Sequence, residues 1–427
     1  MSPAAPGVPV ADHEIGSAVD VPAPAADGHI SLLVRVHGVP VGLVSHLPPD
    51  ASAAGRRQAV WDALASEIGE HLRADGYNGE PSAQAVRSTA DHCAYAGTAV
   101  DRLVTVVVCT LGQDPRLRWT LESLLAQSYR PLEIVVVDND PDSGRVAELL
   151  GGDGEPTLRI VPEPRRGLSF ARNAGLAAAR GDLVAFTDDD AVADRDWIRR
   201  LVAPFGQDSA VACTSGLVLP AELETHSQLL FEQYGGFDKG FRTTVWQVGD
   251  RPHTVAQAVA GERDALFPFS PGIFGSGNNM AFDRAWILEH GGFDTLLGAG
   301  ARTRSGEDVD AFLTVLLHGR LLVYVPQAII RHFARSDLLG LRTQVYGYGI
   351  GMAATITKHL LSSPRTALTV LVRLPAGLLK LVDPRSSKNV AKEQDYPRDL
   401  TLVEMRGYLV GPTTYLAARL RRRRSQS

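Results

Sequence analysis

Residues 183–190, Leu-Val-Ala-Phe-Thr-Asp-Asp-Asp, join an apolar segment directly to three carboxylates, with no lysine or arginine between them. The apolar part predicts a buried β-strand. Such a concentration of negative charge at a strand end is typical of a site for Mg²⁺ or Mn²⁺, which take carboxylate oxygens together with substrate phosphates. The alternative is a solvated acidic turn that caps the next helix, because aspartate is also favoured at helix N-termini. On its own, this stretch leaves both interpretations open.

The composition is that of a globular protein large enough for two or three domains. The chain has 427 residues, of which 44% are hydrophobic and 21% charged, as in ordinary soluble proteins. Its net charge of −5 gives no whole-chain reason to expect nucleic acid as a partner. Arginines nevertheless crowd the C-terminal end, at positions 419 and 421–424.

The three cysteines, Cys93, Cys109 and Cys213, lie far apart without a CxxC pair. This spacing argues against a disulfide framework and against a thiolate zinc site. Few and scattered cysteines favour a reducing compartment.

No export or membrane-spanning segment is predicted. The first 34 residues contain no lysine or arginine and no long apolar run, whereas a secretory signal needs both. The most apolar late stretch, residues 366–382, is interrupted by Arg373, Pro375 and Lys380, and so falls short of the roughly 20 apolar residues that a spanning helix needs. We therefore expect a cytoplasmic protein, free or attached peripherally to the inner face of the membrane.

The chain divides into four predicted segments. Residues 1–28 are rich in alanine and proline and predict a disordered tail. Residues 29–100 predict a small α+β module, made of a hairpin and a helix from about residue 58 to 73, followed by a polar linker. Residues 101–335 predict the main domain, and residues 336–427 a helical C-terminal region with a basic tail.

Strands alternate with helices in the main domain. Strands are predicted near residues 103–108, 132–137, 158–161 and 183–186, with helices near 117–128 and 170–179. This alternation predicts an α/β fold, a Rossmann-like and mostly parallel sheet with helices on both faces. Ligands bind at the carboxyl ends of such strands. Because Thr110, Asp138 and Asp188–Asp190 all follow strand ends, we expect them to line one site.

The chain lacks the usual glycine-rich loops for nucleotides, since neither GxGxxG nor GxxxxGK[ST] follows the first strand. A pyrophosphate would then need a metal and basic side chains, for which Arg165, Arg166 and Arg172 are candidates. The alternative for each arginine is a solvated loop position. The glycines at 347, 349 and 351 predict close helix packing rather than a nucleotide loop.

A second acidic group, Glu307 and Asp308, opens a predicted helix. Carboxylates in a first turn stabilise a helix through its dipole. In a reaction where a hydroxyl displaces a nucleotide leaving group, one of them could instead accept the hydroxyl proton. His332 follows a predicted strand at 323–330, where it could complete a metal shell or serve as a structural hydrogen-bonding residue.

Seven segments in order carry a further signal. They are Cys109-Thr110, residues 136–139 (Val-Val-Asp-Asn), 166–175 (Arg-Gly-Leu-Ser-Phe-Ala-Arg-Asn-Ala-Gly), 186–190 (Phe-Thr-Asp-Asp-Asp), 275–282 (Gly-Ser-Gly-Asn-Asn-Met-Ala-Phe), 292–294 (Gly-Phe-Asp) and 306–308 (Gly-Glu-Asp). This ordered set, which spans residues 104–332, closely resembles the family 2 glycosyltransferases of GT-A fold. It is far more specific than any one of its members.

The resemblance implies an inverting transferase that uses a nucleotide-diphosphate sugar. In that family the residues matching Thr110 and Asp138 hold the nucleobase. The DxD element holds the ribose and the metal-bound diphosphate, which maps onto Asp188 and Asp190. Asp189 is an alternative ligand, because a third carboxylate leaves the register open.

The resemblance also implies roles in catalysis and acceptor binding. Asp308 is expected to be the general base, and Glu307 to position or bind the acceptor. His332 is expected to join the metal, Mg²⁺ or Mn²⁺. Further donor and acceptor contacts are expected as follows: Arg166 and Arg172 on the donor, Asn278 and Asn279 on the acceptor.

The predicted partners are a nucleotide-diphosphate sugar donor and a glycan, lipid-linked or small-molecule acceptor. Two alternatives stay open: a catalytically silent nucleotide-sugar-binding scaffold and a sugar nucleotidyltransferase. The second would normally carry a glycine-rich, basic first loop, whereas residues 110–115 (Thr-Leu-Gly-Gln-Asp-Pro) are poor in glycine. The C-terminal region predicts either contact with an anionic membrane surface or a solvated basic tail after a buried helix.

Overall fold

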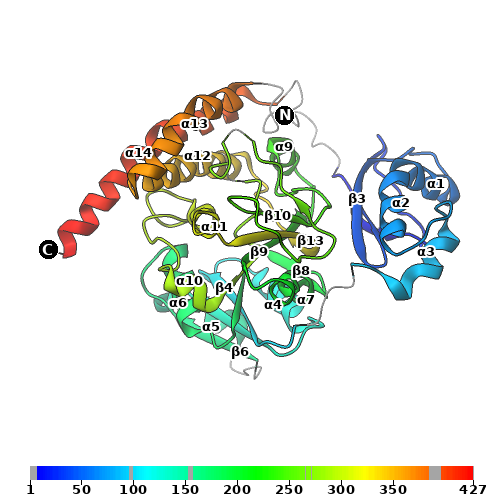
Figure 1. The fold of residues 1–427 in the computed structure, drawn as a ribbon, viewed down its shortest axis with the longest axis horizontal. Helices are drawn as coiled ribbons and strands as arrows, with labels where there is room; N and C mark the ends of the chain where they lie inside the picture. Colours follow the sequence, from blue (N-terminus) through cyan, green and yellow to red (C-terminus); the bar gives the residue numbers. More distant parts are fainter. Residues whose placement is uncertain are drawn as a thin grey trace.

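The computed structural model describes residues 7–95, 100–151, 157–264, 266–270, 272–383 and 396–426. A central α/β domain carries a small N-terminal module on one side and long C-terminal helices on the other (Figure 1). Among the described residues, no helix combines the length and the apolar character needed to cross a bilayer.

The N-terminal module is a three-stranded sheet covered on one face by helices. Its strands are β1 (Val10–Glu14), β2 (His29–Val36) and β3 (Val39–His46), with β2 and β3 forming the predicted hairpin. Its helices are α1 (Ala53–Ala63), α2 (Ala65–Ala74) and α3 (Ala83–Thr89). The single helix predicted for residues 58–73 is therefore divided, at Leu64.

The predicted disordered tail over residues 1–28 is wrong for β1, which pairs in parallel with β2. The composition of this segment offers few apolar side chains, but the neighbouring strand supplies backbone hydrogen bonds. Ile15 and Val21 are also buried in the core of the module. Residues 1–6 lie outside the described part of the chain.

The central domain is built on a mixed sheet of ten strands among the described residues. Their order is β11-β10-β13-β9-β12-β7-β4-β5-β6, and β8 pairs with β13. The strands are β4 (Val104–Thr110), β5 (Leu132–Asp138), β6 (Leu158–Pro162), β7 (Leu183–Asp188), β8 (Ala191–Ala193), β9 (Val211–Pro220), β10 (Thr244–Trp246), β11 (Val259–Ala260), β12 (Met280–Asp283) and β13 (Leu321–His332). The four predicted strands are confirmed as the parallel set β6-β5-β4-β7, and antiparallel β12 then separates them from the parallel pair β9 and β13.

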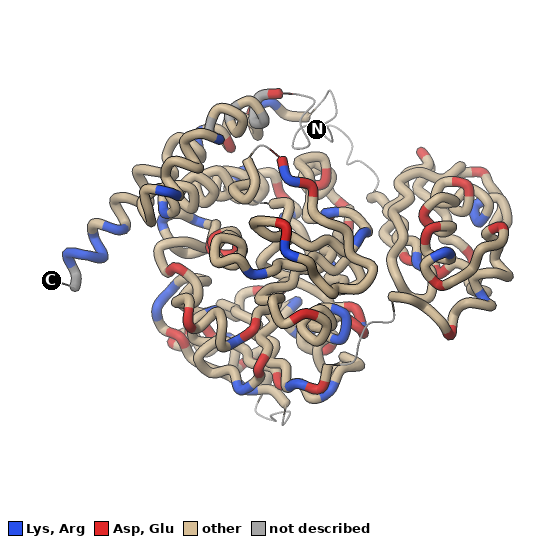
Figure 2. The backbone as a smooth tube through the Cα atoms, viewed as in Figure 1, with Lys and Arg blue, Asp and Glu red and all other residues tan. Residues whose placement is uncertain are grey.

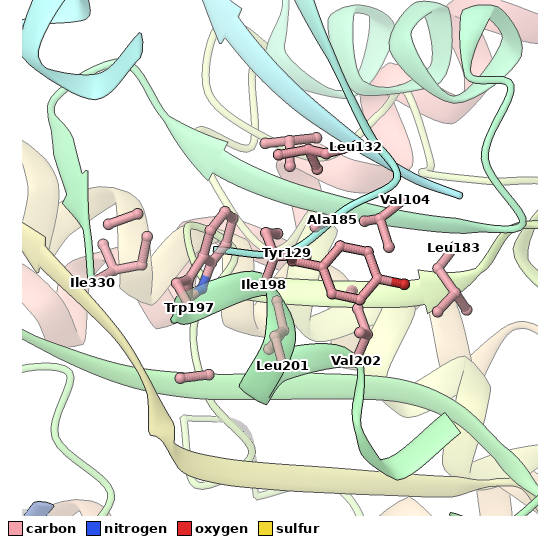
Figure 3. Packing of buried hydrophobic residues seen from close by; sticks show 14 of the residues in the cluster. Val104, Tyr129, Leu132, Leu183, Ala185, Trp197, Ile198, Leu201, Val202 and Ile330 are labelled. Atoms are coloured by element: carbon pink, nitrogen blue, oxygen red, sulfur yellow. The ribbon is translucent and has the colours of Figure 1, made fainter. Parts of the chain in front are cut away.

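Helices cover both faces of this sheet, as the α/β pattern predicted. They are α4 (Leu117–Leu125), α5 (Arg145–Leu150), α6 (Leu168–Ala178), α7 (Trp197–Val202), α8 (Pro204–Gln207), α10 (Arg284–Glu289) and α11 (Glu307–Leu317). A further helix, α9 (His226–Tyr234), packs instead against the C-terminal helices. On one face, Trp197, Ile198 and Leu201 of α7 pack with Val104 and Ile330 of the sheet (Figure 3). The opposite face is covered by apolar side chains of α6, α10 and α11.

The C-terminal region consists of α12 (Leu338–Leu360), α13 (Pro364–Val382) and α14 (Arg398–Gln426). Two glycines allow α12 and α14 to touch. A Cβ on Gly349 would lie 2.3 Å from the carbonyl oxygen of Glu404, and one on Gly407 would lie 2.6 Å from that of Tyr346. The predicted close helix packing is confirmed for Gly349, whereas Gly347 and Gly351 face Arg304 and Ser305, which precede α11.

The module docks on the central sheet through the uncovered face of its own sheet. Side chains alternate along β2, so that Leu32 and Val34 enter the core of the module while Leu33 faces the other way. Leu33 is fully buried in a cluster that includes Leu217, Leu219, Tyr324 and Ile329 of β9 and β13. Beside this cluster, Arg35 forms ion pairs with Asp12 at 2.8 Å and Asp194 at 2.7 Å.

We expect Leu33→Ala to weaken this docking. Removing a fully buried leucine costs about 2–5 kcal/mol of stability, and here the cavity would open between the module and the sheet. Urea denaturation should show the loss, and limited proteolysis should release the module earlier. Val19→Ala, at an exposed position of the module, is the matched control. Identical denaturation curves for Leu33→Ala and the unsubstituted protein would contradict the docking described here.

Candidate active site

Three strand ends meet at one edge of the sheet. In the register of the parallel strands, Thr110 of β4 lies beside Asp138 of β5, and Cys109 lies beside Asp188 of β7. The prediction that these residues line one sheet edge is confirmed. Polar side chains are held here because a parallel strand buried on both faces leaves only its end open to a ligand.

A compact group of metal-binding donors forms at this edge. Asp188, Asp190 and His332 each offer one ligand atom, and these atoms all lie within 4.8 Å of one another. The arrangement follows from the chain path: after β7 the backbone turns into β8, which pairs with the end of β13 and sets Ala191 opposite His332. The Nε2 atom of His332 consequently lies 3.3 Å from Oδ1 of Asp190.

The charges of this pair favour each other. Burial opposes ionisation of Asp190, but the facing imidazole and its hydrogen bond hold the pKa of that carboxyl below its ordinary value. Burial likewise opposes protonation of His332, yet Asp190 holds its pKa above the ordinary value. Asp190 and His332 therefore stabilise each other as an ion pair.

Asp189 points away from this group. Its Oδ2 accepts a hydrogen bond of 2.5 Å from the hydroxyl of Thr110, whose oxygen accepts in turn from the amide of Gly112. Burial raises the pKa of Asp189 to about 7, against the opposing effect of the Thr110 hydrogen bond. Of the three carboxylates that the sequence could not tell apart, the structure brings Asp188 and Asp190 to His332, and Asp189 to Thr110.

Arg172 connects the metal-binding group to the second acidic group. Its guanidinium is 3% exposed and lies 3.6 Å from Oδ1 of Asp188 and 2.8 Å from Oε1 of Glu307. It also donates to the carbonyl of Gly277 at 3.0 Å. Arg172 therefore positions the carboxylates of Asp188 and Glu307, and its predicted contact with the sugar donor stays a prediction.

We expect Arg172→Met to destabilise the protein by about 3–5 kcal/mol, because it leaves the buried Glu307 carboxylate without its charged partner. The loss should appear as a lower urea midpoint. Arg172→Met combined with Glu307→Gln should cost less than the sum of the two single variants, since the pair is coupled. Arg302→Met, at an exposed arginine before α11, is the control. Additive losses would show that the ion pair has no such role.

Asp308 is the more accessible of the two acids at the start of α11. Glu307 is 5% exposed, and burial raises its pKa to about 7, with the charge of Arg172 opposing. Asp308 is only half-buried. Its Oδ2 accepts from the amide of Gly277 at 2.9 Å and its Oδ1 from that of Val309 at 2.8 Å, so the carboxylate is fixed in direction while it keeps lone pairs for a further partner.

The opposite end of the site is formed by β5 and the loop before α6. Asp138 is buried and accepts a hydrogen bond from the amide of Asp140 at 3.0 Å. Asn139 holds the loop, because its side chain donates to the carbonyls of Glu163 and Arg165 and accepts from the amide of Gly167. Arg166 is exposed there and pairs with Asp140 at 3.0 Å.

The two predicted acceptor residues differ sharply. Asn279 is fully buried and all of its amide is used, by the carbonyls of Leu217 and Ala328 and by the indole of Trp197. The predicted acceptor role is therefore wrong for Asn279, which joins β12 to β9 and β13. Asn278 is 2% exposed, and its Oδ1 has no hydrogen-bond partner among the described residues.

Gly277 and Asn173 also support the site. Both lie in the ordered motifs of the sequence, where no role was predicted for them. The amide of Gly277 fixes Asp308, and a Cβ at this position would lie 2.9 Å from that of Asp308. Asn173 clamps the loop after α10, because its side chain both donates to and accepts from the backbone of Phe293 at 2.8 Å. In the sequence, only their place in the ordered motifs pointed to these two residues, because contacts with distant backbone groups produce no characteristic spacing of residues.

The known proteins to which this chain is similar are glycosyltransferases. Residues 105–266 match the sequence model described as glycosyl transferase family 2. The chain is similar to a glucosyl-dolichyl phosphate glucuronosyltransferase of Haloferax volcanii, with 29% identity over 235 residues, covering 54% of this chain and 68% of that protein. It is also similar to a pre-mycofactocin glycosyltransferase of Mycobacterium tuberculosis, with 26% identity over 259 residues.

The second match covers 60% of this chain and 48% of the mycobacterial protein, so the chain spans about half the length of that relative. Among solved structures, a mannosyltransferase of Pyrobaculum calidifontis in complex with GDP-Man and Mn²⁺ aligns with a TM-score of 0.46 and 18% identity, covering 84% of this chain and 98% of that one.

Proposed function

The chain is a glycosyltransferase with a family 2 domain of GT-A fold, and we propose that it transfers a sugar with inversion from a nucleotide-diphosphate donor in a metal-dependent reaction. One observation carries this proposal. Arg172 contacts both Asp188 of the metal-binding group and Glu307 beside Asp308. A place for the leaving diphosphate and a place for the base are therefore held together by one buried side chain.

The residues present fit a divalent cation. Two carboxylates and one imidazole supply oxygen and nitrogen donors within 4.8 Å of one another. Carboxylates suit both Mg²⁺ and Mn²⁺, whereas an imidazole ligand favours the softer Mn²⁺. Asp188, Asp190 and His332 would hold the ion, which when bound neutralises negative charge on the departing diphosphate.

Asp308 would act as the general base. Its carboxylate is fixed by two backbone amides and is half-buried, so a hydroxyl that enters the site can donate to it without reorganising the protein. As the acceptor oxygen attacks the anomeric carbon, its proton passes to Asp308 and the bond to the diphosphate breaks on the opposite face of the sugar. That in-line geometry gives inversion.

Buried polar atoms without partners support a place for sugar hydroxyls. Oδ1 of Asn278 and Oε2 of Glu307 are both buried and have no hydrogen-bond partner among the described residues. Such atoms carry a desolvation cost unless a ligand satisfies them. We assign both to acceptor or donor hydroxyls, while Thr110, Asp138 and Arg166 would contact the nucleotide at the other end of the edge.

A lipid-linked, phosphate-bearing acceptor fits the C-terminal helices best. Leu368, Leu371 and Val372 form an exposed apolar stripe on α13, and the end of α14 is strongly basic (Figure 2). A cavity of about 960 Å³ is lined in part by α14. Its basic lining residues include Arg165, Lys358, Arg419, Arg422 and Arg423. Apolar stripes with adjacent arginines bind anionic membrane surfaces. Equal binding to neutral and to phosphatidylglycerol-containing vesicles would contradict this peripheral contact.

A thermal-shift screen tests the donor. UDP-, GDP- and dTDP-sugars are compared with and without Mn²⁺, because a ligand that binds only the native state raises the melting temperature. At a concentration about 100-fold above its Kd, a donor adds about 2.7 kcal/mol, which is a shift of several degrees. We expect one class of donor to act, and only with the metal. Release of pyrophosphate from a nucleoside triphosphate and a sugar phosphate would instead indicate a nucleotidyltransferase.

A further inference from the structure

Four side chains with metal-binding atoms converge in the N-terminal module, far from the active site. His37 lies at the tip of the hairpin between β2 and β3, His71 lies in the last turn of α2, and Asp75 follows that helix. Cys93 comes from the segment after α3. One ligand atom from each of the four lies within 4.8 Å of all the others. The side chains of His37, His71 and Asp75 are 5%, 3% and 0% exposed.

Four of the six separations are close to the edges of a zinc tetrahedron, and the other two lie within 4.8 Å. Zinc holds nitrogen or oxygen at about 2.0–2.1 Å and sulfur at about 2.3 Å, so ligand atoms should stand about 3.3 Å apart, or about 3.6 Å where one is sulfur. Nδ1 of His37 lies 2.9 Å from Oδ2 of Asp75, and Nε2 of His71 lies 3.2 Å from each of these two atoms. Sγ of Cys93 lies 3.8 Å from Nε2 of His71.

Hydrogen bonds around the cluster orient two of these side chains, His37 and Asp75, toward its centre. Nε2 of His37 lies 2.6 Å from the carbonyl oxygen of Val86, so this nitrogen carries the proton and donates it. A neutral His37 therefore turns the lone pair of Nδ1 toward Asp75. The other oxygen of Asp75 accepts from the amide of Ala94 at 2.7 Å. Outer partners of this kind fix the tautomer and direction of metal ligands.

Without a cation, lone pairs of His37 and Asp75 face each other at close range. Nδ1 of His37 and Oδ2 of Asp75 are both acceptors when the imidazole is neutral, yet they lie 2.9 Å apart. The backbone of His37 is in the left-handed region, at φ +56°, as is that of Gly38, because these two residues form the tight turn of the hairpin. Either a second proton on His37 or a metal ion must relieve the contact. Only the metal also uses the nearby sulfur of Cys93.

We propose that His37, His71, Asp75 and Cys93 form a four-coordinate site for a zinc-type divalent ion. Four protein ligands close the coordination shell, as in structural rather than catalytic zinc sites. The ion would join the hairpin tip, the end of α2 and the segment at Cys93, which are separated by many residues in the chain. The charges of the ligand set also fit a divalent ion, because the buried carboxylate of Asp75 and the thiolate of Cys93 would together balance its two positive charges.

The position of the cluster indicates what the ion would stabilise. Tyr95 stacks on the ring of His71, with centroids 5.0 Å apart, and its carbonyl oxygen accepts a hydrogen bond from Arg200 of α7. The segment held by Cys93 is thus one of those that contact the central domain. A metal here would fix the module against that domain without taking part in sugar transfer.

Metal analysis of the full-length protein tests the proposal. After incubation with zinc and removal of free ion, we expect about one tightly held zinc per chain and its loss in Cys93→Ala and His71→Gln. Asp190→Asn should retain it, which separates this ion from the one proposed at the active site. His92→Gln is the matched control, because His92 is exposed and adjacent to Cys93.

Cobalt substitution tests the site in the unsubstituted protein and therefore does not depend on a variant that folds. The unsubstituted protein loaded with Co²⁺ should show the visible absorption of a tetrahedral ion and the near-ultraviolet charge-transfer band of a thiolate ligand. Folded protein that holds no zinc at the module, or zinc retained in full by folded Cys93→Ala, would overturn the proposal. Since these readouts do not involve sugar transfer, they stand apart from the proposed function.

Discussion

Asp308→Asn should reduce sugar transfer by about 10²–10⁴-fold, the usual contribution of a positioned general base, while donor binding stays within about a factor of three. Asparagine keeps the size of the side chain and an oxygen for one of the two amides that hold Asp308, but it cannot take a proton from the acceptor. The loss should therefore appear in kcat and not in the Kd of the donor.

Initial-rate kinetics and calorimetric titration of the donor measure the two quantities. Glu289→Gln, at an exposed acid of α10, removes the same charge elsewhere and should leave both unchanged. Transfer by Asp308→Asn within about tenfold of the unsubstituted rate would exclude Asp308 as the base, because a base worth less than that falls below the normal range. Loss of donor binding would instead point to a structural role.

Removal of the active-site metal should have the second large effect. If the ion contributes several kcal/mol to the transition state, its loss lowers the rate by about 10³-fold or more, since 1.36 kcal/mol corresponds to a tenfold change. We expect a chelator to abolish transfer, Mn²⁺ to restore it, and Asp190→Asn to prevent the restoration. Titration of Mn²⁺ followed by electron paramagnetic resonance measures the affinity directly.

Asp189→Asn is the sharpest control for this prediction. It removes the same charge from the adjacent residue, but Asp189 is bonded to Thr110 and lies outside the group formed with His332. It should keep most of its affinity for Mn²⁺. If Asp189→Asn loses the metal as fully as Asp190→Asn does, or if the chelator leaves transfer unchanged, the ligand set proposed here is wrong.

The fold and the position of the site were predictable because their signals are local. Runs such as Val104–Val108 mark strands buried on both faces, and in a parallel sheet the residues that follow them meet at one edge. The sequence thus placed Thr110, Asp138 and the three aspartates together. It could not separate Asp188 and Asp190 from Asp189, because that depends on the pairing of β8 with β13.

Other features of the structure depend on contacts between distant segments, and such contacts leave no pattern in the amino-acid sequence. Nothing in the sequence distinguishes Asn278, whose Oδ1 lacks a hydrogen-bond partner among the described residues, from Asn279, whose side-chain amide is fully bonded. The cysteine spacing argued against a thiolate zinc site, but spacing alone could not exclude a cluster with a single cysteine. The four donors of that cluster come from a hairpin, a helix and a loop.

The surface of β9 and β13 that packs against the N-terminal module bears on how the module and the central domain could have been joined by gene fusion. Leu217 and Leu219 are buried in a cluster that includes Leu33 of the module, and Arg331 on the neighbouring strand pairs with Asp12 of β1. A domain that evolved alone would expose these leucines to water and to other chains. Homologues that lack the module should therefore carry polar residues at these positions, so the pair Leu217 and Leu219 can serve as a marker of its presence in genome sequences.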